Sequence, residues 1–231
     1  MSVLFNSYKN EVNMKKICMV VFSLCLFGCI NFGQKSNRAE VQDSIIADPQ
    51  DDRVMEQSCH LKFKGVPIDG KLEKFVTRMK RKGFKYLETD GGVVVLQGDF
   101  ADFKDCMVYV CTLDNKDLVS RISVVFPEQE QWKYLYGDYK HLKGLLTEKY
   151  GKPYSCVEKS NKSYGVEYHS DDSKMFNVKF NESKYETRFV CDNGEIVLWI
   201  EHDEHFSCFV MLTYKDKANS DVIREHAKDD L

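Results

Sequence analysis

The chain has 231 residues, of which 43% are hydrophobic and 30% are charged, and its formal net charge is −3 at pH 7. This composition is that of a globular protein and excludes an intrinsically disordered chain, which is poor in hydrophobic residues and high in net charge. The mildly acidic balance argues against non-specific nucleic-acid binding, which needs a basic face to displace counterions.

An uncharged run from Ile17 to Ile30 follows Lys15 and Lys16 near the start of the chain. A helix of this length would extend about 21 Å, which is too short for the ~30 Å hydrocarbon core of a bilayer. A basic start, a short apolar run and then small and polar residues are typical of a secretory signal peptide. We therefore expect residues 1–33 to be an export signal whose true start is Met14.

Two cleavage sites compete at the end of this signal. The sequence LFGC approximates a lipobox, in which Cys29 would be lipidated and become the new N-terminus. Cleavage before Gln34 would instead be the work of signal peptidase I. The exported protein is thus expected in the periplasm or attached to the outer membrane as a lipoprotein. Loss of residues 1–33, with three lysines and one glutamate, would change its net charge from −3 to −5.

The rest of the chain divides into a linker and a domain. Residues 34–58 are polar with a few scattered aliphatic residues, which predicts a flexible linker. Residues 59–231 are predicted to form a single domain, with two tandem units of about 59–127 and 128–231 as the alternative description. A domain of this length can bury a sizeable core.

The first part of the domain reads as a short strand, a helix and a group of strands. A strand and turn span His60–Gly70, and Asp69 is a candidate N-cap for a helix that ends at Gly83. The helix carries apolar residues at i, i+3, i+4 and i+7. Strands follow at Val93–Leu96, Met107–Leu113 and Val119–Phe126, the last two joined by a hairpin turn.

The second part repeats this layout. A helix is predicted over Glu130–Tyr150 and ends at Gly151. Strands are then expected at Phe176–Phe180, Tyr185–Cys191, Ile196–Ile200 and Phe206–Tyr214, and a last helix at Asp216–Asp229. The repeated order predicts an α+β fold, with antiparallel sheet packed against helices and a duplicated helix-plus-strands unit.

Six cysteines follow Cys29, and none forms a Cys-x-x-Cys pair. An exported protein can form disulfides, and six cysteines allow 15 pairings. We expect a bridge between Cys106 and Cys156, because the duplicated layout would place their segments at one end of the sheet. The alternative is that both are free buried thiols.

The sequence contains no nucleotide-binding loop and no nucleophile elbow, and no cofactor is expected. The best metal candidate is His202-Asp203-Glu204-His205, where two histidines flank two carboxylates. The competing interpretation is a solvated hairpin turn. On the second helix, Trp132, Tyr134 and nearby tyrosines could line a ligand surface, although their spacing favours the core.

The motifs F-x-G-V-P-I-D-G at Phe63–Gly70, L-x-G-x-F at Leu96–Phe100 and L-T-x-K-Y-G-K-P at Leu146–Pro153 carry a family resemblance. They resemble a family of uncharacterised exported proteins of Bacteroides-type gut bacteria, over most of Leu61–Leu231. The family implies no activity and no site residue. The repeated layout is also similar in architecture to the β-lactamase-inhibitor-protein-like fold.

Two functions are therefore open. The first is a non-enzymatic module of the cell envelope that binds a protein or a small ligand through one sheet face, with no nucleic acid and no membrane contact beyond a lipid anchor. The alternative is a metal-dependent hydrolase that uses His202 and His205. The absence of a recognisable catalytic constellation favours the first, and the protein is not expected to be an enzyme.

Overall fold

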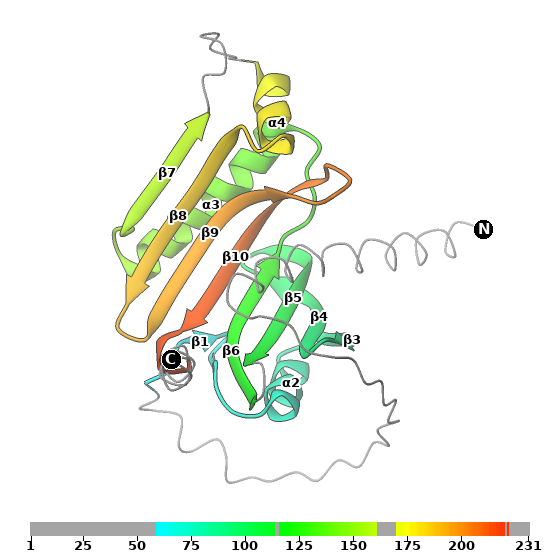
Figure 1. Cartoon of the computed structure of the whole chain (residues 1–231), viewed down its shortest axis with the longest axis vertical. Coiled ribbons are helices and arrows are strands. Elements are labelled where there is room, and N and C mark those ends of the chain that lie inside the picture. Colours follow the sequence, from blue (N-terminus) through cyan, green and yellow to red (C-terminus); the bar gives the residue numbers. More distant parts are fainter. Residues whose placement is uncertain (1–58, 114–115, 161–169, 220, 222–231) are drawn as a thin grey trace, which may run out of the picture. The chain divides into compact units, whose positions relative to one another are not determined.

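The computed structural model of the chain describes residues 59–113, 116–160, 170–219 and 221 (Figure 1). The chain divides into a first part, residues 1–58, and a second part, residues 59–231, and every described residue lies in the second part. The expected export signal and linker, with Cys29, lie outside the described residues.

In chain order, the described elements are β1 (Lys62–Phe63), β2 (Val66–Pro67), α2 (Leu72–Arg81), β3 (Lys85–Asp90), β4 (Val93–Phe100), β5 (Phe103–Leu113), β6 (Lys116–Val125), α3 (Trp132–Tyr150), β7 (Ser155–Ser160), α4 (Asp171–Lys179), β8 (Ser183–Cys191), β9 (Gly194–His202) and β10 (Cys208–Asp216). Strands β1 and β2 form a small hairpin of their own. The other eight strands form one sheet in the order β3-β4-β5-β6-β10-β9-β8-β7, and every neighbouring pair is antiparallel. The predicted α+β class is confirmed.

The sheet is built from two copies of one unit. Helix α2 leads into β3–β6, and helix α3 leads into β7–β10, so the last strands of the two units, β6 and β10, meet in the middle. Each helix is followed by a glycine with positive φ, Gly83 at +92° and Gly151 at +81°. Only glycine adopts this conformation without a steric penalty, so both exits turn the chain sharply back into a strand.

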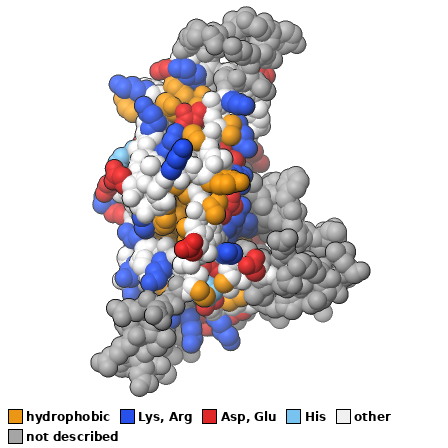
Figure 2. Space-filling view, turned by 90° about the vertical axis from the view of Figure 1, so that its left-hand side faces the viewer, with side chains coloured by type: hydrophobic (Ala, Val, Ile, Leu, Met, Phe, Trp, Pro, Cys, Tyr) orange, Lys and Arg blue, Asp and Glu red, His pale blue; other side chains and the backbone are white. Residues whose placement is uncertain are grey.

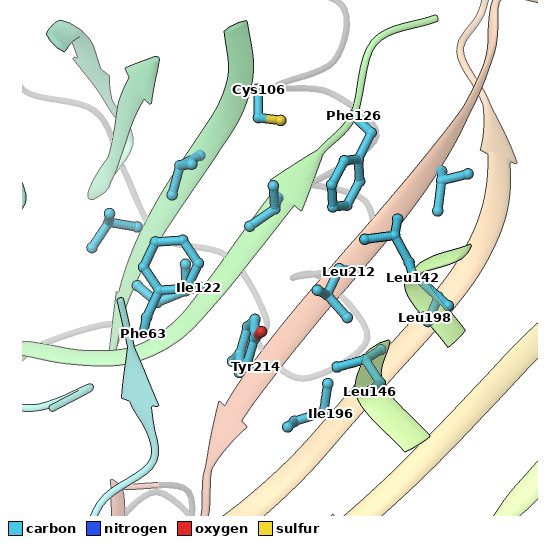
Figure 3. Close-up of a cluster of buried hydrophobic side chains, with 14 of the residues drawn as sticks. Phe63, Cys106, Ile122, Phe126, Leu142, Leu146, Ile196, Leu198, Leu212 and Tyr214 are labelled. Atoms are coloured by element: carbon cyan, nitrogen blue, oxygen red, sulfur yellow. The ribbon is translucent and has the colours of Figure 1, made fainter. Parts of the chain in front are cut away.

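All described helices pack on one face of the sheet. Helix α2 contacts β6, whereas α3 and α4 contact β8, β9 and β10 (Figure 1). The core between these layers is continuous across the junction of β6 and β10, where Ile122 and Tyr214 are neighbours (Figure 3). From α3, Leu142 and Leu146 contribute to the same core. One hydrophobic layer therefore serves both units.

The opposite face of the sheet is also apolar along its centre. Its apolar side chains with less than a tenth of their surface exposed are Val93, Val95, Tyr109, Cys111, Val125, Val197, Phe209 and Met211. No helix in the described part of the chain packs against them. Runs such as Val93–Leu96 are consequently apolar on both sides, which is why they lack the alternation of a half-exposed strand.

The beginning and the end of the described chain are tied together at a buried carboxylate. Asp216 is fully buried, and its Oδ1 accepts a hydrogen bond from Leu61 N at 2.7 Å. Its Oδ2 lies 2.9 Å from His60 Nδ1 and accepts a bond from Asn219 N at 3.0 Å. These bonds fix the entry of the chain to the end of β10.

The N-cap predicted for helix α2 is wrong, and most of the predicted C-terminal helix lies outside the described residues. Asp69 does not cap α2, because the N-cap is Lys71, and the carboxylate of Asp117 accepts the hydrogen bond from Leu72 N instead (3.0 Å). The C-terminal helix predicted for Asp216–Asp229 is described only at its start, residues 217–219 and 221.

Replacement of Gly194 by alanine should destabilise the domain by roughly 2–4 kcal/mol. Gly194 begins β9 with φ +155°, and an added Cβ would collide with the Lys215 carbonyl oxygen and lie 2.6 Å from Leu61 Cδ1. Chemical denaturation measures the effect. Gly144→Ala in helix α3 is the matched control, because nothing lies within 4 Å of its new Cβ.

The control variant should match or exceed the wild type by ~0.5–1 kcal/mol, because alanine is the better helix former. Equal stability of the two variants would contradict the described packing at the β8–β9 turn.

Candidate binding surface

Helix α4 occupies a segment for which the sequence pattern predicts a strand, so that prediction is wrong. The alternation Phe176-x-Val178-x-Phe180 fits a period of two. However, the Ser170 hydroxyl oxygen accepts a hydrogen bond from Ser173 N at 3.2 Å, which caps a helix. Two acidic residues in the first turn further favour the helix N-terminus. Capping outweighs the strand-like alternation.

Helix α4 is apolar on two sides. Met175 and Val178 face inward and are buried in the core. Phe176 and Phe180 lie four positions apart on the outer side, and they are 54% and 51% exposed. Outward positions of a surface helix are normally polar, so two adjacent phenylalanines there need an explanation beyond folding.

The turn between β9 and β10 places a third exposed ring beside this helix. Asp203 is 1% exposed, and its Oδ1 accepts hydrogen bonds from the backbone N–H groups of His205 and Ser207, both at 2.8 Å. This bonding curls the turn so that Phe206 has φ +63°, which is unfavourable for a bulky side chain. The ring of Phe206 is 46% exposed as a result.

These rings stack into a continuous row, here called the aromatic column: His202, Phe206, Phe180 and Phe176. Ring centroids are 6.0 Å apart for His202 and Phe206, 5.5 Å for Phe206 and Phe180, and 4.2 Å for Phe180 and Phe176. All three pairs are stacked, with interplanar angles between 20° and 30°. The column lies where the end of α4 meets the β9–β10 turn. Helix α4 is labelled in the upper part of Figure 1.

The metal candidates take structural places in this turn. His202 Nδ1 lies 2.8 Å from the Asp203 carbonyl oxygen, and its Nε2 lies 3.3 Å from the Asn181 side-chain oxygen. His205 Nε2 lies 3.5 Å from Glu204. Within the described ranges, no group of three or more His, Cys, Asp or Glu side chains is placed to hold a metal ion.

The aromatic residues of helix α3 mostly belong to the core. Trp132 and Tyr139 are buried, and both rings contact Tyr185 of β8. The Tyr139 hydroxyl lies 2.6 Å from the Thr187 hydroxyl, so its polar end is satisfied. Tyr134 alone projects from this group, at 52% exposed.

The expected bridge between Cys106 and Cys156 is contradicted. Cys106 lies on β5 and Cys156 on β7, with β6, β10, β9 and β8 between them in the sheet. At ~4.8 Å per strand, the two strands are about 24 Å apart, far beyond the span of a disulfide. Both cysteines are free thiols. The duplication holds, but it joins the two units through their last strands and so separates these segments.

No family model, curated protein or solved structure matches this chain. In the part of the chain that the structure describes, the helices are too short or too polar to cross a bilayer.

Asp203→Ala should destabilise the domain by roughly 2–3 kcal/mol, because it removes a charged acceptor from two backbone N–H groups. Glu204→Ala is the matched control, since that neighbouring carboxylate is exposed and should change stability by less than about 0.5 kcal/mol. Urea denaturation of both variants measures the difference. Similar losses in both would show that Asp203 does not organise the turn.

Proposed function

We propose that the domain is a non-enzymatic binding module of the cell envelope, and that its aromatic column takes a short apolar segment of a partner protein. The observation that carries this proposal is the stack of three phenylalanines, each about half exposed, at the place where α4 and the β9–β10 turn meet. Exposed aromatic side chains are typical anchors of protein interfaces.

The duplicated architecture supports this choice of surface. In the first unit, β3 and β4 are joined by the tight turn Gly91-Gly92. The equivalent connection in the second unit runs from residue 161 to residue 182 and contains α4. Helix α4 is therefore an addition to the common unit, and with its C-cap residue Phe180 it supplies two of the three exposed rings.

The central part of the sheet face opposite the helices is a poorer candidate. Its apolar side chains, including Tyr109 and Met211, have at most 7% of their surface exposed. The rings of the aromatic column, by contrast, are already exposed to a partner.

The size of the column limits its partner. A phenylalanine can bury about 150–250 Å², so three half-exposed rings offer on the order of 300 Å². A stable dimer buries about 800 Å² on each partner. The column is thus too small to hold a second copy of the chain by itself, but it suits a few apolar side chains of a partner, in a transient complex.

Site-specific photo-crosslinking in the producing cell tests this proposal. With the photoreactive residue p-benzoylphenylalanine at position 176, we expect a covalent adduct with a protein, mapped by mass spectrometry to an apolar segment. The combined changes Phe180→Ser and Phe206→Ser should reduce the adduct about tenfold or more, as expected for loss of anchor residues.

Position 154 is the matched control, because Tyr154 is 79% exposed but lies outside the aromatic column. Equal adduct yields from positions 154 and 176 would contradict the proposal, as would an adduct that persists in the double variant. A protein that forms no adduct from position 176 would contradict it as well.

A further inference from the structure

A cluster of polar side chains lies between helix α3 and the edge strand β7, away from the aromatic column. Cys156 Sγ lies 3.2 Å from Lys143 Nζ, which donates to it. The Thr187 hydroxyl also donates to this sulfur at 3.5 Å. Cys156 in turn donates to Glu158 Oε1 at 3.6 Å, and the same carboxylate oxygen accepts a hydrogen bond from Lys143 Nζ at 2.7 Å. Two donors and one carboxylate acceptor therefore meet at one thiol.

The lysine in this cluster is held in its charged form. Partial burial favours the neutral amine, but hydrogen bonds to Glu158 and Cys156 outweigh it and keep the pKa of Lys143 well above its usual value. A fixed ammonium beside sulfur stabilises the negative charge that sulfur carries as a nucleophile.

The cluster is open to solvent. Cys156 is exposed, and β7 pairs only with β8 among the described strands, so one side of β7 faces outward. The view onto this edge shows basic, acidic and apolar side chains intermingled on an open surface (Figure 2). A small reagent can therefore approach the sulfur from outside.

The other described thiols differ from Cys156. Cys106, Cys111 and Cys208 are buried, and burial raises the pKa of Cys106 to about 12 and that of Cys208 to about 11. Cys191 is half-buried and donates to the Gly194 carbonyl oxygen at 3.4 Å. Cys59 is exposed like Cys156 and provides an internal comparison.

We propose that Cys156 is a reactive thiol that exchanges with low-molecular-weight disulfides, and that Lys143 is its positioning residue. The Cys156 thiolate attacks one sulfur of the small disulfide. A new bond forms between the two sulfurs while the S–S bond of the reagent breaks. The departing thiolate takes up the proton that Cys156 has lost, so a protein thiol and a disulfide become a mixed disulfide and a free thiol.

The test uses 4,4′-dithiodipyridine, a neutral disulfide, on the folded full-length protein at pH 7, with peptide mapping to follow each cysteine. We expect Cys156 to react about fivefold faster than Cys59. Lys143→Met should remove this advantage, whereas Lys143→Arg, which keeps the charge, should preserve most of it. The rate at Cys59 should be the same in all three proteins.

Equal rates at Cys156 and Cys59 in the wild type would overturn the proposal, as would an undiminished rate in Lys143→Met. Modification of the buried cysteines reports unfolding of a variant. If Lys143→Met unfolds, the wild-type ratio and the Lys143→Arg protein decide the matter: loss of the advantage in a folded Lys143→Arg protein counts against the charge of Lys143.

Discussion

The pairing of β6 with β10 holds the two units together. Among the described strands it is the one ladder that joins them, with Leu212 opposite Val124 and Thr213 opposite Ser123. The hydroxyls of Ser123 and Thr213 lie 2.8 Å apart at a buried position, and the core crosses this junction on the helix side. Without β10, the first unit would expose the apolar strand β6 as an edge.

Through this pairing, strands from the beginning and the end of the domain form one sheet. The last described strand inserts next to β6, about 90 residues earlier in the chain, and Asp216 at its end binds the backbone of Leu61. Such long-range contacts slow folding, because the chain must close large loops to make them. The two units are repeats of one architecture, yet their shared core does not divide between them.

The parts that the two units share differ from the parts that form the candidate site. Both units contain a helix, a glycine exit and four strands, and these parts hold most of the buried side chains. The first unit is preceded by the β1–β2 hairpin, whereas the second unit carries helix α4 with its exposed rings and the Cys156–Lys143 contact that α3 makes with β7.

Local patterns in the sequence predict much of this fold. The apolar spacing over Glu130–Tyr150 predicts helix α3, and the hairpin expected between Met107–Leu113 and Val119–Phe126 corresponds to the pairing of β5 with β6, since both signals are local. The sheet order is not local. The expectation for Cys106 and Cys156 fails for that reason, because nothing near either residue reports which strands will be neighbours.

The aromatic column is hidden from sequence reasoning for a related reason. Phe176 and Phe180 are predicted to be core residues whether the segment is taken as a strand or as a helix, because hydrophobicity alone does not report exposure. Ser170 followed by two acidic residues was the available signal for a helix start, and a helix there would have placed both rings on one face. The positive φ of Phe206 has no counterpart in the sequence.

The central claim is that the rings of the aromatic column serve binding and contribute little to folding. The most direct test compares the unfolding free energies of Phe176→Ser and Met175→Ser, neighbouring positions on α4, of which the first is 54% exposed and the second 6%. Phe176→Ser should stay within about 1 kcal/mol of the wild type, and Met175→Ser should lose about 3 kcal/mol. A loss at Phe176 as large as that at Met175 would show that the ring is part of the core and would contradict the account.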